Sequence, residues 1–349
     1  MTTSDAAAAT APPAEPAGTD LLSRAPAEGA RLLALSFLDQ AAAARPRLDD
    51  PDDAEALHDF RVALRRLRSC LKAYRAHLED SVPRKLAKKL RRLADATGSG
   101  RDAEVQIEWL RQRASHLSAY HRAGLAWLLD RLEARKREAY DAIRAEVAEE
   151  FAEVERELRR RLSVYRAEVR LDGAEKRETL GGTTAAILRE MGGELAAHLA
   201  RLDGAGDERE VHRARIRAKR LRYLVEPLAD EVADARPLVK RIKNLQDLLG
   251  ELHDAHVLEH ELARAVEAAA AERAAKLFAV SLDAVRDEKL LRAERRRARE
   301  SGLLALARQN RDRRDRLYET LAEEWLDGRG GDLLREVERL ETALAPPAP

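Results

Sequence analysis

Histidine, arginine and lysine recur at helical spacing between residues 58 and 72, and such groups can bind an anion. If this stretch is a helix, with about 100° of rotation per residue, one arc is apolar and the arc beside it is cationic. The apolar arc holds Leu57, Phe60, Leu64, Leu67 and Leu71, and the cationic arc holds His58, Arg61, Arg65, Arg68 and Lys72. A solvated helix face normally mixes both signs of charge. A stripe of cations alone therefore indicates an anionic ligand.

The same pattern occurs again 154 residues later, where His212 stands for His58, Arg215 for Arg61 and Lys219 for Arg65. The tripeptide Arg-Leu-Arg at 66–68 reappears at 220–222, so Arg220 is the counterpart of Arg66 and Arg222 that of Arg68. Glu226 replaces Lys72, which makes the second stripe shorter.

A second matched segment follows each stripe. Residues 93–105 match residues 245–257 at an offset of 152, including a glycine and an aspartate, Asp102 in one copy and Asp254 in the other. Just before it, Lys88 and Arg91 match Lys240 and Lys243, and we expect these four to extend the basic site. Two offsets that differ by only two residues predict an internal duplication.

These motifs resemble the CHAD family, the conserved histidine α-helical domain. The resemblance rests on His-x-x-Arg-[Val/Ile]-x-x-[Arg/Lys]-Arg-Leu-Arg followed by Leu-x-x-x-x-Gly-x-x-x-Asp, both present twice, and it covers about residues 22 to 327. It implies an all-α fold of two pseudo-symmetric helical-bundle halves. It further implies a central basic channel, lined by both halves, that binds inorganic polyphosphate, association with polyphosphate granules, and no catalytic activity.

Composition and charge suit such a fold. Only 4% of the 349 residues are aromatic and 36% are charged, so the core must be built mainly from Leu, Val and Ala on amphipathic helices. The net charge of +1 hides a segregation: residues 58–92 carry a net +9 and residues 212–243 a net +6, which leaves −14 on the rest. Such a distribution focuses an anion into one place.

The chain order predicts a disordered tail at 1–20, one domain at 21–327 and a short helix with a tail at 328–349. The domain divides into halves at about 21–170 and 171–327. Within it, the periodicity predicts helices over 21–44, from Pro83 to Gly98, and as one long scaffold helix over 120–165. Residues 181–184 read as a helix start and not as a phosphate loop, since no strand precedes them and no Gly-Lys-[Ser/Thr] follows.

The single cysteine, Cys70, borders the apolar arc, and we expect a buried, inert thiol. No basic segment followed by a continuous apolar run opens the chain, and no apolar stretch approaches the roughly 20 residues of a membrane span. These features predict a cytoplasmic protein without a membrane partner, and the resemblance to the CHAD family implies a location at polyphosphate granules. Oligomeric state does not follow from the sequence.

His253, His256 and His260 form the one local cluster that could bind a metal, because their spacing places three imidazoles on one helix face. No closing ligand is identifiable, and the first copy has Arg101 and Glu104 where His253 and His256 stand. We therefore expect no metal and no cofactor, and interpret these histidines as polar surface or anion-binding groups.

The mechanism expected is electrostatic. If the duplication pairs the halves about a pseudo-twofold axis, the two stripes face one channel that a chain of phosphates would neutralise. Neighbouring arginines should keep His58 and His212 neutral until phosphate binds, so binding should tighten as the pH falls from about 7 to 6.

Two alternatives remain. A nucleic-acid binder would need stacking aromatics near the cations, and the stripes offer only Tyr74 and Tyr223, so nucleic acid is an unlikely partner. A metal-dependent phosphate-handling enzyme would need a metal site or a base and nucleophile. The sequence predicts no carboxylate cluster facing the stripes, and hence no enzyme.

Overall fold

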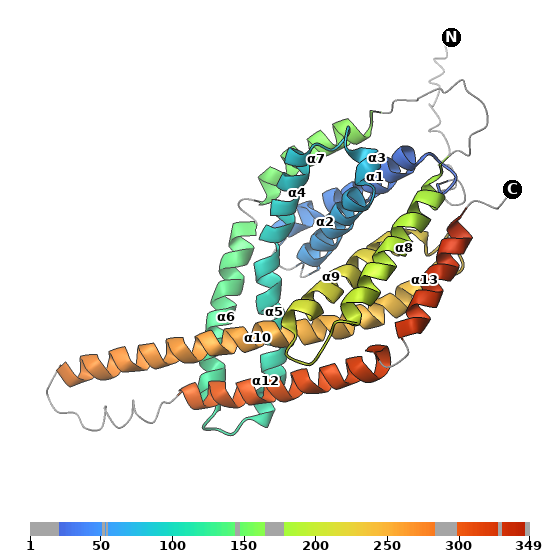
Figure 1. The fold of residues 1–349 in the computed structure, drawn as a ribbon. Helices are drawn as coiled ribbons and strands as arrows, with labels where there is room; N and C mark the ends of the chain where they lie inside the picture. The colour runs from blue at the N-terminus through green and yellow to red at the C-terminus, as the bar shows by residue number, and fades with distance from the viewer. Residues whose placement is uncertain are drawn as a thin grey trace, which may run out of the picture.

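The computed structural model describes residues 21–50, 53, 55–143, 147–164, 178–282, 299–326 and 330–345. These residues form helices joined by short turns, and no strand occurs among them. The all-α prediction is confirmed (Figure 1). The predicted tail at 1–20 and the predicted start of the second half at 171–173 lie outside the described residues.

Seven helices come from the first half of the chain and the others from the second half, among the described residues. The first set is α1 Pro26–Ala44, α2 Ala56–Ala73, α3 Arg75–Leu78, α4 Arg84–Ala96, α5 Gly98–Arg113, α6 Arg122–Ala142 and α7 Ala148–Leu162. The second set is α8 Leu180–Leu199, α9 Glu208–Val225, α10 Ala235–Leu282, α12 Arg299–Leu321 and α13 Gly330–Leu344. A π-helical turn, Ala322–Leu326, follows α12.

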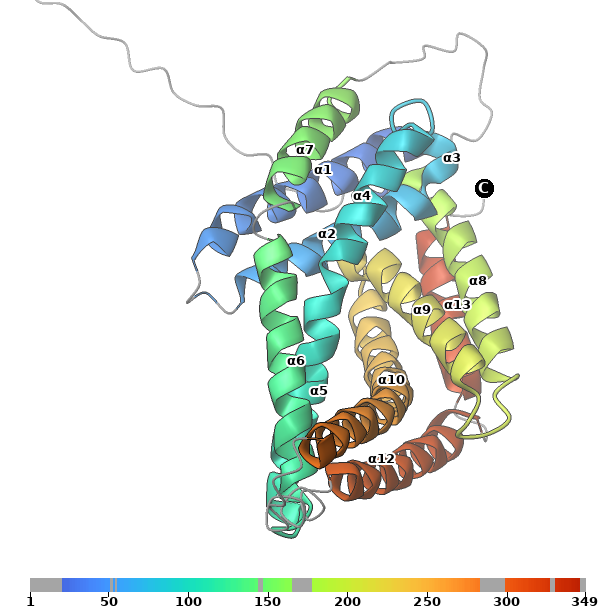
Figure 2. The ribbon, with the colours of Figure 1, turned by 90° about the vertical axis from the view of Figure 1, so that its left-hand side faces the viewer.

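The two halves use the same order of packing partners. Helix α1 packs on α2 as α8 packs on α9, and α5 packs on α6 as the distal part of α10 packs on α12 (Figures 1 and 2). Helix α7 contacts α1 and α4, and α13 correspondingly contacts α8 and α10. Helices α2 and α9 meet across the two halves. This is the arrangement that a duplication would leave, although the duplication itself stays a prediction from the sequence.

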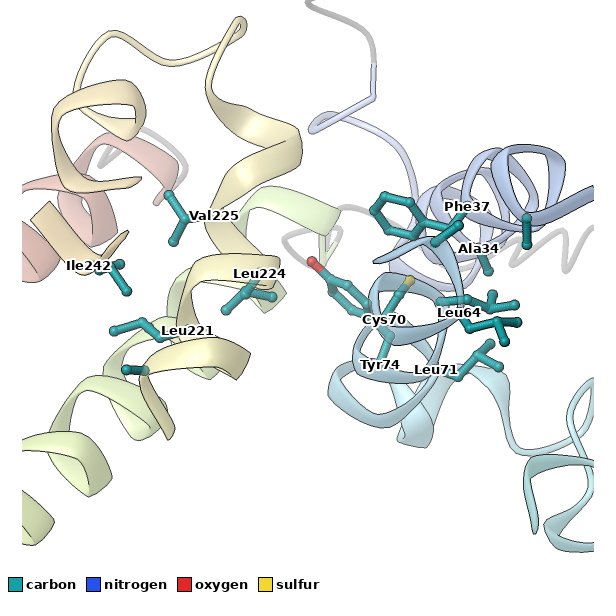
Figure 3. Close-up of a cluster of buried hydrophobic side chains, with 14 of the residues drawn as sticks. Ala34, Phe37, Leu64, Cys70, Leu71, Tyr74, Leu221, Leu224, Val225 and Ile242 are labelled. Carbon is teal, nitrogen blue, oxygen red and sulfur yellow. The ribbon is translucent and has the colours of Figure 1, made fainter. Parts of the chain in front are cut away.

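Two hydrophobic clusters hold the molecule together. The larger one joins both halves and includes apolar faces of α1, α2, α7, α8, α9, α13 and the first part of α10 (Figure 3). The smaller one lies where α5 and α6 cross α10 and α12. In it, Gly124 and Gly302 let two helix backbones touch, since a Cβ on Gly302 would lie 2.2 Å from the carbonyl oxygen of His121.

The basic helices sit on the larger cluster by the apolar arcs that the spacing predicted. On α2 the five predicted apolar residues are all buried, and Phe60 packs edge-on against Phe151 of α7 with ring centroids 5.0 Å apart. On α9 the buried line is Val211, Ala214, Ala218, Leu221 and Val225. Burial of one arc on each helix therefore sets the direction of the cationic arc beside it.

Several predicted elements are confirmed, with small shifts at their ends. Helix α4 ends two residues before Gly98, and α8 starts at residue 180 with the Thr179 side chain accepting a hydrogen bond from the Gly182 amide. The first helix begins at Pro26 instead of Leu21, since a turn occupies residues 21–24. Cys70 is buried, and burial raises the pKa of its thiol to about 12.

Two predictions about the scaffold need correction. Between residues 120 and 165 the structure describes two helices, α6 and α7, instead of one, with most of the buried face of α6 in the smaller cluster and that of α7 in the larger. Residues 144–146, between the two helices, lie outside the described residues. The C-terminal helix α13 packs on α8 and buries Leu333, Val337 and Leu340 in the main core, so it is part of the bundle. No described helix is long and apolar enough to cross a membrane.

Candidate functional site

Cations from both repeats meet where α2 and α9 lie against one another. Arg65 of α2 lies close enough to Arg215 and Lys219 of α9 that its charge lowers the pKa of both side chains. We call Arg65, Arg215 and Lys219 the central cluster. The structure thus brings three sequence-predicted cations, one from the first stripe and two from the second, into one electrostatic environment.

Arg215 and Lys219 of the central cluster are largely desolvated, whereas Arg65 Nε donates a hydrogen bond to the carbonyl oxygen of Arg61 at 3.3 Å. Among the described residues no acceptor reaches the buried Nε of Arg215, and Gly250 of α10 lies directly beside that atom. Burial first, and then the charges of Arg215 and Arg65, lower the pKa of Lys219 to about 7. Burial also lowers the pKa of Arg215. Desolvated cations of this kind are costly unless an anion accompanies them.

Two carboxylates act on the central cluster from other helices. Asp254 of α10 and Asp102 of α5 both act electrostatically on Arg215. Burial raises the pKa of Asp254 even though Arg215 opposes the shift, and Asp102 raises it further. The helical periodicity could not place these acids, because their position depends on how α5 and α10 meet.

The two repeat histidines differ in their surroundings. The ring of His212 stacks at a tilt on that of His253, with centroids 4.9 Å apart. Burial, followed by Arg215, lowers the pKa of both histidines, that of His253 to about 4. His58 lies exposed on α2, and within the described part of the chain its ring makes no hydrogen bond or ion pair. After the larger effect of burial, Arg215 and Lys219 of the central cluster both lower the pKa of His212, so this histidine lies near the cluster.

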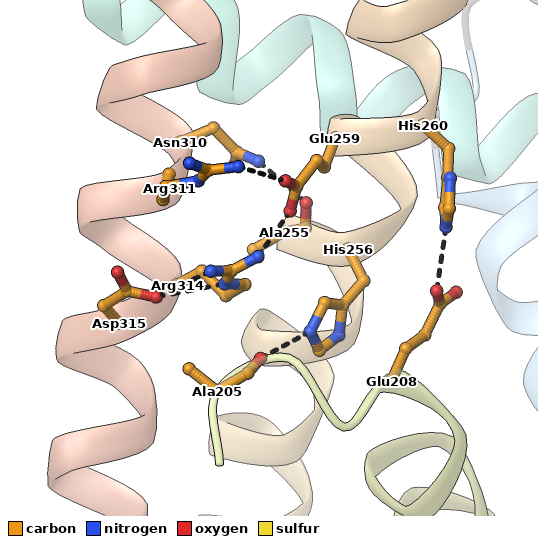
Figure 4. Close-up of polar contacts among 10 residues, drawn as sticks. All are labelled: Ala205, Glu208, Ala255, His256, Glu259, His260, Asn310, Arg311, Arg314 and Asp315. Atoms are coloured by element: carbon orange, nitrogen blue, oxygen red, sulfur yellow. Dashed lines mark hydrogen bonds and ion pairs between the residues drawn. The ribbon is translucent and has the colours of Figure 1, made fainter.

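The α10 histidines have different partners, His253 the ring of His212, and His256 and His260 the two groups that Figure 4 shows. His256 is 4% exposed and its Nε2 donates a hydrogen bond to the carbonyl oxygen of Ala205 at 2.7 Å. His260 contacts Glu208 at 2.8 Å on the other side of the loop. No group of three potential metal-ligating side chains occurs among the described residues. The interpretation of His256 as a polar surface group is wrong, since it anchors the 202–206 turn in the core.

At one end of the α2–α9 contact, basic residues are neutralised. Arg66 Nε lies 3.2 Å from Glu226 Oε2, and Arg222 lies 3.1 Å from Glu226 Oε1. Arg222 also donates to Gln246 of α10 at 2.8 Å. At the other end, Arg68 pairs with Asp95 at 3.0 Å.

The remaining predicted site residues are more scattered. Arg61 is buried on α2, whereas Lys88 is exposed on α4 and Arg91 shares Asp95 with Arg68. Lys240 and Lys243 are exposed on α10. Lys243 precedes Gly250 by seven residues, two helical turns, so it shares the face of α10 that meets Arg215.

The two tyrosines near the stripes are buried and have partners within the protein. Tyr74 is 2% exposed and its hydroxyl lies 2.7 Å from Thr184 Oγ1. Tyr223 is also buried, and the Arg222 guanidinium lies 4.8 Å from its ring centroid. Neither ring offers a free face on which a nucleic-acid base could stack.

Sequence comparison places this architecture among known proteins. A family model described as CHAD domain matches residues 33–263. Among solved structures, the crystal structure of the CHAD domain from the plant Ricinus communis is similar, with a TM-score of 0.58 and 20% sequence identity. The match covers 86% of this chain and 92% of that chain. No curated protein matches.

Proposed function

The chain belongs to the CHAD domain family, and we propose that it binds inorganic polyphosphate at the central cluster and the cations around it. The observation that carries the proposal is the position of Arg65, from the first stripe, beside Arg215 and Lys219 from the second. A ligand that binds between the two halves needs cations from both stripes, and the central cluster contains them.

The physical argument is that cations outnumber acids at the site. Asp254 and Asp102 act on Arg215, whereas the central cluster contains three basic side chains. A bound phosphate would accept charge-assisted hydrogen bonds from the guanidinium groups and from Lys219. A linear polymer would place such a group at each successive cation, which a single phosphate ion cannot do.

The direct test is a calorimetric titration with polyphosphate of defined length, followed by competition with RNA at about 150 mM salt, where nonspecific electrostatic binding weakens steeply. Retention of polyphosphate in the presence of excess RNA supports the proposal. Displacement by RNA would show that the site binds nucleic acid instead. The burial of Tyr74 and Tyr223 argues against that outcome, since neither ring is available for stacking.

We further propose that binding, without hydrolysis, is the activity. The carboxylates near the cluster are Asp102 and Asp254, and they stand beside Arg215 as charge partners. Release of orthophosphate from polyphosphate in the presence of magnesium or manganese would show that the protein is an enzyme. A cytoplasmic location at polyphosphate granules follows from the same proposal, and imaging a tagged chain in polyphosphate-replete and polyphosphate-depleted cells tests it.

Binding is expected to weaken as the pH rises above about 7. Lys219 has a pKa of about 7 in the free protein, where it faces Arg215 and Arg222 from α9, Arg65 from α2 and Asp254 from α10. A phosphate beside it holds the proton on, so binding takes up a proton and the affinity falls by up to about tenfold per pH unit. Calorimetry between pH 6 and 9 measures this slope.

Two variants separate the groups responsible. Lys219→Arg keeps a charge throughout this range and should flatten the slope above pH 7. The His212→Ala variant should flatten only the part near pH 6, because the pKa of His212 is lowered from its ordinary value of 6.5. An unchanged slope in Lys219→Arg would exclude Lys219 as the titrating group.

Lys219→Met is expected to stabilise the free protein while it weakens polyphosphate binding. The folded-state pKa of about 7 lies below the ordinary value of 10.5, so the unfolded chain binds more protons between these pH values. The charged amine therefore destabilises the fold at and below pH 7, and this cost disappears as the pH rises through 10.5. Removing it should raise the free energy of unfolding by about 1 to 3 kcal/mol, measurable by urea unfolding at pH 7. A loss of stability would make Lys219 a structural residue.

A further inference from the structure

Each end of the α2–α9 contact contains an equivalent pair of residues from the two repeats, and the two pairs differ in charge. The repeat matches Arg66 to Arg220 and Lys72 to Glu226. At one end of the α2–α9 contact, Arg66 forms an ion pair with Glu226. At the other end the equivalent residues are both cations, and Arg220 lies close enough to lower the pKa of Lys72, after the larger effect of burial.

The end that contains Lys72 and Arg220 has an excess of positive charge, and we call it the open end. Arg68 and Arg217 have acid partners there, Asp95 at 3.0 Å and Glu194 at 2.7 Å. Lys72 and Arg220 form no ion pair or hydrogen bond with any described residue. Lys72 is exposed and Arg220 is half-buried, and burial is the largest influence on the lowered pKa of each.

The opposite end, which we call the closed end, has its donors engaged. Glu226 accepts from Arg66 and Arg222, Arg222 also donates to Gln246, and Arg66 also donates to Gln40. An incoming phosphate would have to displace the Glu226 carboxylate from two guanidinium groups. It would also meet the negative charge of that carboxylate, which disfavours an anionic ligand.

Both ends connect to the central cluster along a helix face. On α2, Arg65, Arg68 and Lys72 follow at helical spacing, and seven residues advance about 10 Å along the axis. On α9, the matching line is Lys219, Arg222 and Glu226. In one direction, a phosphate chain that starts in the central cluster therefore passes Arg68, which is paired with Asp95, and reaches Lys72 and Arg220, which are unpaired among the described residues. In the other direction it reaches the ion-paired Glu226.

We propose that polyphosphate leaves the central cluster only through the open end, while the Arg66–Glu226 pair blocks the closed end, so that this protein binds the terminus of the polymer and not its middle. The proposal rests on polyphosphate being the ligand. It depends on a difference between the two repeats, Lys72 in the first and Glu226 in the second, that lies outside their shared motif.

The test is the number of proteins bound per polymer chain. A linear polymer has two termini, so the wild-type protein should saturate at about two molecules per chain at any polymer length. Calorimetry and light scattering with short and long polyphosphate of defined lengths give this ratio. A wild-type ratio that rises with polymer length would overturn the proposal while leaving polyphosphate binding intact, whereas absence of binding would reject the proposed function itself.

Three variants sharpen the result. Glu226→Lys gives the closed end the charge of the open end, and the ratio should then increase with polymer length. Lys72→Glu closes both ends, and the affinity should fall about tenfold or more. The double exchange Lys72→Glu with Glu226→Lys keeps the net charge and moves the open end, so it should restore both wild-type affinity and the ratio of about two. A double exchange that behaves like Lys72→Glu alone would also contradict the proposal.

Discussion

Replacing both Arg65 and Lys219 with glutamate is expected to lower the affinity for polyphosphate about a hundredfold or more. Each residue contributes a charge-assisted hydrogen bond to phosphate, and such bonds are worth roughly 1.5 to 3 kcal/mol each. Two of them correspond to about two or more factors of ten in the dissociation constant. Reversal of the charges adds repulsion of the ligand. Titration calorimetry at constant salt measures the change.

The matched control is Lys276→Glu with Arg308→Glu on the distal parts of α10 and α12. Both side chains are exposed, and the double variant changes the net charge by the same amount. It should bind polyphosphate within about threefold of wild type, because exposed charges beyond a Debye length of about 8 Å are largely screened. Equal losses in the two double variants would show that overall charge controls binding and that the central cluster is no site.

Phe60→Ala is expected to lower the free energy of unfolding by about 3 to 5 kcal/mol. Phe60 is 0% exposed and its ring meets Phe151 edge-on at an interplanar angle of 84°, so the substitution opens a cavity and removes an aromatic pair. The contact docks α2 on α7, and that docking directs the cationic stripe. Guanidinium unfolding, followed by the helical circular dichroism signal, measures the loss.

Leu32→Ala on α1 serves as the comparison, because Leu32 is 42% exposed and its truncation should cost no more than about 0.5 kcal/mol. A cost for Phe60→Ala as small as that of Leu32→Ala would mean that the apolar arc of α2 does not hold the helix in place. Polyphosphate should raise the unfolding midpoint of both variants, since a ligand at about 100 times its dissociation constant adds about 2.7 kcal/mol to the folded state.

Local spacing accounts for what the sequence predicted well. An amphipathic helix displays its apolar and cationic arcs wherever it packs, so the burial of Phe60 and Leu64 and the position of the basic arc beside them could be derived from a period of 3.6 residues. The burial of Arg61 could not, because it depends on neighbouring helices. Start signals are local as well, and the Thr179 cap of α8 follows that rule. The family match follows from the same repeated motif.

Helix continuity was less predictable. The apolar period runs through residues 120–165 with no proline or glycine except Gly124, and yet the chain divides into α6 and α7. The division follows from the two hydrophobic clusters, each of which requires its own helix direction. Docking onto separate cores overrides local propensity here.

From the sequence alone one could derive the all-α class, the two stripes and the substitution of Glu226 for Lys72. Tertiary structure alone decided which charges meet: Asp102 and Asp254 beside Arg215, Glu226 on Arg66, and Lys72 facing Arg220. The reason is that a helix period fixes direction around one axis, whereas the pKa of Lys219 and the pairing of every cation depend on burial and on side chains from other helices. Those neighbours exist only once α2, α5, α9 and α10 have packed together.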